Sequence, residues 1–237
     1  MGTAGPIPMP IDESGGSQPE AGPAGADLAL LTLAQWLSPA YPVGAFAYSH
    51  GLESAVAEGA VRDADGFGRW LDDVLLFGGG RNDAILLVAA YAAAPDALAG
   101  IDALARALAP SAERAMETEL QGAAFAATTS AIWGGANAPL AYPVAVGAAA
   151  AAQGLPLEKT LQFYLHGFAS NLTAAATRLV PLGQTEAQAV LAARGPALAD
   201  LSALALSLTP DDLGSSAFMA DIASMRHETQ YSRMFRS

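Results

Sequence analysis

The segment 156-PLEKTLQFYLHGFASNLTAA-175 carries the most regular apolar pattern in the chain. Pro156 suits the first turn of a helix, where its missing N–H has no intrahelical partner to lose. Apolar residues then recur every three or four positions, at Leu157, Leu161, Tyr164, Leu165, Phe168, Leu172 and Ala175. This spacing places them on one stripe of an α-helix. We therefore expect a long helix here, at the centre of the core.

The same spacing recurs on both sides of this helix. One helix is expected after a potential N-cap at Asp27 and a second after Asp63 or Asp65. We expect the Gly78-Gly79-Gly80 run to end the second helix. Further helices are expected over roughly Asn82–Ala94, Asp96–Ala109 and Ser111–Trp133, with two shorter ones on either side of Gly195-Pro196. No strand pattern competes with them. The sequence predicts an all-α fold, a single-domain multi-helix bundle.

Composition narrows the class of function. Hydrophobic residues make up 52% of the 237 residues and charged residues only 14%, so much of the apolar surface is expected to face another protein. The net charge of −12 argues against nucleic acid, because phosphate binding depends on Lys and Arg. Cysteine is absent, which excludes disulfides, thiolate nucleophiles and cysteine-based metal sites.

The beginning of the chain differs from the rest. Residues 1–26 are rich in Gly, Pro, Ser and Glu, and they contain no large apolar cluster. Such a segment buries too little surface to offset the entropy of ordering, so we expect a disordered N-terminal tail. The helical domain is expected over 27–237, including a C-terminal tail at Asp211–Ser237. No signal-peptide pattern is evident, which predicts a cytoplasmic protein.

The uncharged stretch Leu120–Leu157 resembles a membrane span in length. It is mostly Ala and Gly, is interrupted by glycines and prolines, and lacks a run of Leu, Ile or Phe of spanning length. We interpret it as two small-residue helices that pack closely, with a turn at Gly134–Pro139.

The residues that could carry chemistry do not form a catalytic or metal-binding pattern. His50, His166 and His227 lie in separate segments without a second ligand at helical spacing, and a structural role is expected for His166. Gly78–Arg81 lacks the ending of a phosphate loop, and no nucleophile elbow is present. Acidic pairs, namely Asp72-Asp73, Asp211-Asp212 and Glu117/Glu119, are interpreted as solvated helix faces. We expect no catalytic centre, cofactor or metal site.

Two segments have compositions that core packing does not explain. Leu37–Glu53 is a Pro/Gly loop with three aromatic residues, typical of a positioned binding element. Asp221–Ser237 mixes Met, Tyr, Phe and Arg, which are enriched where proteins meet. This second segment has a charge of +1, which leaves −13 for everything before it. We therefore expect it to dock beside the loop and to bury Met225, Tyr231 and Phe235.

Four motifs carry a resemblance to a known family. They are 38-SPAxPVGAFxYSxGLE-53, 170-SNL-172, 178-RLVPLGQT-185 and the closing segment Asp221–Ser237. In this order, over about Leu28–Ser237, the chain resembles the UreF family of urease accessory proteins.

The resemblance implies an all-α, homodimeric protein without enzymatic activity. It implies a scaffold that binds the accessory protein UreD (also called UreH) and recruits the GTPase UreG, so that nickel is inserted into apo-urease. It further implies that UreD orders the C-terminal tail, which helps to receive UreG, and that Tyr48 contacts Arg236 or Arg233. The expected partner-binding residues are Pro42, Phe46, Tyr48, His50, Glu53, Met225, Arg226, His227, Glu228, Tyr231, Arg233, Phe235 and Arg236.

Three alternatives remain open. In the first, the protein activates GTP hydrolysis by UreG, since arginine is the residue that such activators insert. In the second, it is a small hydrolase that uses His227, Glu228 and Ser224 or Ser232, although a chain terminus holds catalytic groups poorly. In the third, it stores nickel itself through His and carboxylates, for which three scattered histidines are few.

Overall fold

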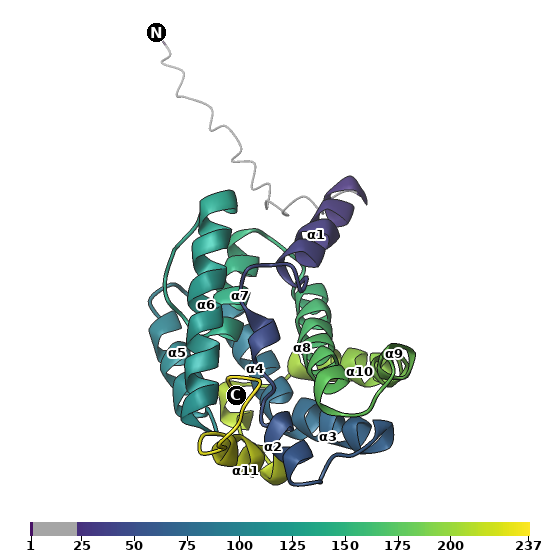
Figure 1. Cartoon of the computed structure of the whole chain (residues 1–237). Coiled ribbons are helices and arrows are strands. Elements are labelled where there is room, and N and C mark those ends of the chain that lie inside the picture. The colour runs from purple at the N-terminus through teal and green to yellow at the C-terminus, as the bar shows by residue number, and fades with distance from the viewer. Residues whose placement is uncertain (2–22) are drawn as a thin grey trace.

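The computed structural model describes Met1 and residues 23–237 of the chain (Figure 1). Within 23–237 all regular elements are helical, which confirms the predicted all-α fold. The α-helices are α1 (Pro23–Trp36), α2 (Leu52–Ala57), α3 (Ala64–Phe77), α4 (Gly79–Ala92), α5 (Leu98–Ala107), α6 (Ala112–Trp133), α7 (Tyr142–Ala152), α8 (Leu157–Leu179), α9 (Gln184–Ala192), α10 (Gly195–Ala205) and α11 (Phe218–His227). Two short 3₁₀ helices, η1 (Ala45–Ala47) and η2 (Pro210–Asp212), lie in connecting segments.

Helix α8 is central to the bundle, as its apolar stripe predicts. It contacts α1, α2, α3, α4, α7, α9 and α10. Leu161, Leu165 and Leu172 are fully buried on its inner face. Full burial of one such side chain stabilises the fold by about 1.5–3 kcal/mol. Because α8 contacts helices from both halves of the chain, this burial stabilises the packing of the two halves against each other.

Small residues let α4, α6 and α7 pack closely. A Cβ added at Gly147 of α7 would lie 2.4 Å from the Leu87 carbonyl oxygen of α4, and one at Gly122 of α6 would lie 1.9 Å from the Leu140 carbonyl oxygen. Glycine is therefore required at both contacts. The uncharged stretch 120–157 forms the end of α6 and all of α7, joined by a turn that includes Gly134–Pro139, as predicted.

One other stretch of the described residues, Ala64–Ala92, is long and apolar enough to cross a membrane by length and composition alone. It consists of α3 and α4, which are separated at Gly78. Of its most apolar part, 61% is buried inside the protein, as in a core helix of a globular domain.

Several helix boundaries differ from the prediction. Helix α1 begins at Pro23, so Asp27 lies inside it and is not its N-cap. The glycine run ends α3 but also opens α4, which begins at Gly79 rather than near Asn82. Asp63 does cap α3, accepting a hydrogen bond of 2.7 Å from the Gly66 N–H. Most of the predicted N-terminal tail lies outside the described residues.

The C-terminal tail folds back on the body. After α10 the chain passes η2 and forms α11, which packs against α2, α3 and α6. The chain end then lies beside α2 and α11, on the side of the molecule away from α1 (Figure 1). We call its last residues, Glu228–Ser237, the terminal segment.

Candidate interaction site

The Pro/Gly loop that joins α1 to α2 takes its shape from residues with positive φ. These are Gly44, His50 and Gly51, with φ of 74°, 56° and 81°. A Cβ added at Gly51 would also lie 2.5 Å from the main-chain nitrogen of Ser224 in α11. Only glycine permits both this dihedral and this approach. The loop motif and the C-terminal motif are therefore in direct main-chain contact.

The terminal segment runs along the loop and bonds to its backbone. The Arg236 N–H donates to the Ala47 carbonyl at 2.8 Å, and the Ser49 N–H donates to the Ser237 carbonyl at 2.8 Å. The Ser49 hydroxyl donates to the same Ser237 oxygen. These bonds fix the register of the segment against the loop without regard to side-chain identity.

Glu53, the second residue of α2, binds main-chain N–H groups of the terminal segment with its carboxylate. It is 8% exposed, and its two carboxylate oxygens accept the N–H groups of Met234 (2.7 Å) and Phe235 (2.8 Å). Hydrogen bonds to a charged group contribute about 1.5–3 kcal/mol each, more than a neutral pair. A buried carboxylate at this position thus selects an extended backbone with two free donors.

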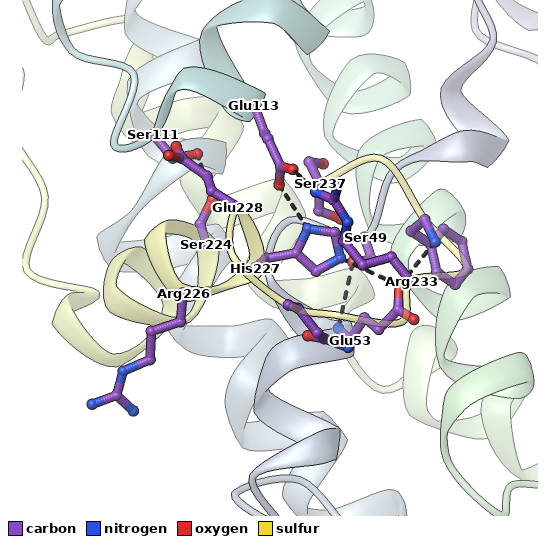
Figure 2. A network of polar contacts seen from close by, with 12 residues as sticks. Ser49, Glu53, Ser111, Glu113, Ser224, Arg226, His227, Glu228, Arg233 and Ser237 are labelled. Atoms are coloured by element: carbon purple, nitrogen blue, oxygen red, sulfur yellow. Dashed lines mark hydrogen bonds and ion pairs between the residues drawn. The ribbon is translucent and has the colours of Figure 1, made fainter.

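His227 ends α11 and lies between two carboxylates (Figure 2). Its Nδ1 is 2.6 Å from Glu113 Oε2, and its Nε2 is 3.3 Å from Glu53 Oε2. The other oxygen of Glu113 accepts from the Arg233 guanidinium at 2.5 Å. One cluster of four side chains therefore connects α2, α6, α11 and the terminal segment.

Glu228 and Ser224 contact the start of α6. The Glu228 carboxylate accepts from the Ala112 N–H at 2.7 Å, where a negative charge also interacts favourably with the helix dipole. Ser111 caps the helix at Arg114 N and shares a 2.7 Å hydroxyl contact with Ser224. The residues named in the hydrolase alternative have different partners: Glu228 accepts from Ala112, Ser224 contacts Ser111, and His227 contacts Glu113 and Glu53.

Glu117 is not on a solvated helix face, and this part of the prediction was wrong. It is 2% exposed, whereas Glu119 pairs with Arg106 on the outer side of α6. Glu117 receives hydrogen bonds from Gln121 (2.9 Å) and Ser237 (2.8 Å) and an ion pair from Arg114. Burial alone would raise the pKa of Glu117, but the Arg114 and His50 contacts outweigh it and lower the pKa to about 2.

His50 is a further contact of Glu117. Its Nε2 is 2.9 Å from Glu117 Oε1, and its ring packs edge-on against Phe168. Burial and the Arg114 charge lower the pKa of His50. His166, expected to be structural, is exposed on the outer face of α8.

Of the two candidate arginines, Arg236 is the one that acts on Tyr48. Burial and the Glu117 carboxylate raise the pKa of Tyr48, and a hydrogen bond from Arg236 opposes this rise. Arg233 is instead paired with Glu113. Arg236, and not Arg233, is therefore the tail arginine that influences Tyr48.

Two pockets share part of their lining: one of about 40 Å³, which Tyr48 lines, and one of about 240 Å³, which Ser224 and Met225 of α11 line. Both are lined by His50, Asp83, Arg114 and Thr118. Burial raises the pKa of Asp83 to about 6, and its carboxylate accepts from the Tyr164 hydroxyl at 2.8 Å. Among the described residues, no group of three or more His, Cys, Asp and Glu side chains could hold a metal ion.

The expected partner-binding residues divide into two groups. Tyr48, Glu53, His227 and Phe235 are buried and hold the terminal segment, and His50 is nearly enclosed. Pro42, Phe46, Met225, Arg226, Glu228, Tyr231, Arg233 and Arg236 are exposed. Docking buries Phe235 as expected but not Met225 or Tyr231, which are 51% and 105% exposed. Met225 belongs to α11 and lies outside the terminal segment, and Tyr231 precedes the stretch Met234–Arg236 whose main-chain N–H groups bond to Glu53 and Ala47.

The chain matches the UreF family model over residues 61–194. A protein of Ruegeria sp. (strain TM1040) is 61% identical over 210 residues, which cover 88% of this chain and 98% of that protein. A protein of Roseobacter denitrificans is 55% identical over 209 residues, covering 88% and 94%. Each is named urease accessory protein UreF.

The chain belongs to the UreF family. More than half of it is covered by the family match, and the alignments with these relatives extend well beyond residues 61–194. A third UreF protein, from Rhodopseudomonas palustris, is 48% identical over 93% of this chain and 98% of its own length. The resemblance identified from the four motifs is thereby confirmed, and the chain is a member of a family of urease accessory proteins.

Several residues of this UreF site were missed because their partners are distant in sequence. Glu113, Arg114 and Asp83 belong to helices on which no motif falls. One signal was available: Arg114, Glu117, Gln121 and Phe125 recur at helical spacing, which places three polar groups on the buried face of α6.

Proposed function

We propose that this UreF-family chain is a non-catalytic, cytoplasmic scaffold of urease maturation. As a homodimer it binds UreD (UreH) and recruits the GTPase UreG, so that nickel is inserted into apo-urease. The observation that supports this most is the seating of the terminal segment. Buried Glu53, His227 and Phe235 fix its path, and Tyr231 and Met234 remain exposed on it at 105% and 62%.

Exposed apolar side chains on a fixed backbone are suited to contact another protein. Phe46 of the loop (72% exposed) and Phe218, Met219 and Met225 of α11 are further exposed apolar side chains. Arg226 and Arg236 contribute positive charge on an otherwise acidic protein. We infer a partner surface that combines apolar pockets with carboxylates.

Direct activation of GTP hydrolysis by an inserted arginine is less well supported than positioning. The Arg233 guanidinium is paired with Glu113, and the Arg236 side chain interacts with Tyr48. An inserting arginine would have to leave these contacts. We therefore favour a role in which the arginines shape the surface that receives UreG.

The experiment that tests the scaffold removes residues 229–237 and keeps Glu228, because α11 itself packs on the body through Ala220 and Ala223. The truncated chain is expected to retain its helix content and to lose recruitment of UreG and activation of urease. Co-purification with UreD and UreG, and urease activity in cells at equal protein abundance, are measured. Normal activation by the truncated chain would refute the proposed role of the segment.

A further inference from the structure

His227 is fully buried, yet both of its ring nitrogens face carboxylate oxygens. A neutral imidazole has one N–H and one lone pair, so it can donate to only one of two acceptors. The second nitrogen would then turn a lone pair towards a carboxylate in a buried site. An imidazolium, which carries two N–H groups, donates to both Glu113 and Glu53.

The charges around the ring lead to the same assignment. Glu53 approaches from α2 and Glu113 from α6, and Arg233 of the terminal segment pairs with Glu113. The neighbouring Glu228 is engaged at the start of α6, and Arg226 pairs with Glu58 at the surface. With a neutral ring, two carboxylates face one guanidinium. A proton on His227 brings the cluster to two negative and two positive charges, which lowers the cost of burying it.

Glu53 connects this proton to the terminal segment. The oxygen that faces His227 Nε2 also accepts the Phe235 N–H, and the other oxygen accepts the Met234 N–H. Loss of the proton would leave Glu53 repelled by the ring lone pair on one side while it holds the segment on the other. The position of the segment is therefore sensitive to the protonation of His227.

We propose that His227 is a positioning residue that carries a proton while the terminal segment is docked, and that loss of this proton as the pH rises releases the segment. This inference rests on the proposed function, because release of the segment then makes recruitment of the GTPase partner depend on pH. The sign follows from the geometry. The docked state needs the proton, so docking is favoured at low pH and weakened at high pH.

The test uses the full chain alone, so that its result does not depend on any partner. Two-bond ¹H–¹⁵N correlation spectra of the histidine rings distinguish an imidazolium from either neutral tautomer, and the His227→Gln variant assigns the His227 signals. Amide exchange, expressed as protection factors, reports whether Met234 and Phe235 are docked. Both are followed from about pH 5 to pH 9, which includes the range between about pH 5 and 8 in which histidine changes its charge.

We expect the His227 ring to be doubly protonated wherever the two amides are protected, and both signatures to be lost together, with protection falling at least about tenfold. His166→Gln, a change at an exposed histidine of α8, is the matched control and is expected to leave the protection of both amides unchanged. A single neutral tautomer of His227 while Met234 and Phe235 remain protected would overturn the proposal. Protection that is unchanged across the range would overturn the coupling to pH.

Two variants distinguish the effect of the His227 charge on docking from the effect of its packing. His227→Gln is expected to lower the protection of Met234 and Phe235 and to remove its pH dependence. Adding Glu113→Gln removes the excess negative charge, so part of the lost protection is expected to return. A role for His227 in packing alone predicts that the double variant is no better than His227→Gln. Recruitment of UreG is measured separately at the same pH values and tests whether docking of the segment controls this partner. If the spectra behave as expected but recruitment does not depend on pH, the proposed function is refuted while the role of His227 in docking stands.

Discussion

The Arg178 guanidinium of α8 lies over the ring of Phe235, 5.5 Å from its centre. Phe235 is 5% exposed and is part of the main hydrophobic core, although it is the third residue from the end of the chain. The central helix thus holds the terminal segment through a cation–π contact and apolar packing. Two motifs that are separate in sequence, 178-RLVPLGQT-185 and Asp221–Ser237, meet at this pair.

Replacement of Phe235 should release the terminal segment without unfolding the body. Truncation of a buried Phe to Ala costs about 3–5 kcal/mol, which is comparable to the two charge-assisted bonds from Glu53 to the segment at about 1.5–3 kcal/mol each. We expect Phe235→Ala to expose the amides of 229–237 to exchange while the far-ultraviolet circular dichroism stays helical. Met234→Ala, at the exposed neighbouring position, is the matched control and should keep the protection. Unchanged protection in Phe235→Ala would show that the core contact does not hold the segment.

The exposed face of the docked segment should act on the partner rather than on the fold. In the double variant Tyr231→Ala/Met234→Ala the amides of Met234 and Phe235 are expected to remain protected, because neither side chain packs inwards. Co-purification with UreD or UreG is expected to fall, since interface contacts of this kind contribute about 1–2 kcal/mol or more each. Leu204→Ala on α10, with an apolar side chain 50% exposed, is the control. Equal binding by both variants would refute a contact at this face.

The Tyr48–Arg236 pair can be tested with small changes. Tyr48→Phe keeps the buried ring and removes only the hydroxyl on which Arg236 acts, and Arg236→Ala removes the other side. Both variants are expected to lose recruitment of UreG while binding to UreD is largely retained. Arg69→Ala, which removes an exposed arginine of α3 outside the two binding segments, should leave recruitment intact. If Tyr48→Phe recruits UreG normally, the hydroxyl contact has no part in that step.

The fold followed from the sequence where apolar residues recur at helical spacing, as in α3, α6 and α8. The helix starts near Asp27 and Gly79 were missed because a possible cap residue does not fix where a helix begins: α1 already starts at Pro23, and α4 starts within the glycine run that ends α3. Motif composition located the loop and the tail. It could not show that Glu53 accepts main-chain N–H groups or that Glu117 faces inwards, because both depend on which distant helix lies opposite.

Asp83 should make the stability of the protein depend on pH. Burial raises its pKa from 3.8 to about 6, so the folded state holds the proton more tightly than the unfolded chain. Stability from this group is therefore fully present below about pH 4 and is lost as the pH rises through about 6, by up to ~3 kcal/mol. Asp83→Asn, whose amide oxygen can still accept from Tyr164, should be more stable than the parent at pH 7.5. Urea denaturation from pH 4 to 7.5 measures this, with exposed Asp73→Asn as control; an Asp83→Asn variant less stable than the parent at pH 7.5 would contradict it.

The close contact at Gly122 should couple the packing of α6 to the interaction site. A Cβ there would lie 1.9 Å from the Leu140 carbonyl oxygen and 2.8 Å from the Tyr142 nitrogen, so Gly122→Ala must displace α6 from the start of α7. We expect a loss of about 3 kcal/mol or more, since backbone atoms cannot yield as a flexible side chain does. Because α6 carries Glu113 and Glu117, protection of the terminal segment should fall as well. Gly100→Ala in α5, where a Cβ meets no atom within 4 Å, should instead stabilise the chain by about 0.5–1 kcal/mol. Thermal unfolding and amide exchange are measured for both variants. A Gly122→Ala chain as stable as the parent would refute the close contact, and a destabilised chain with a fully protected segment would refute its coupling to the interaction site.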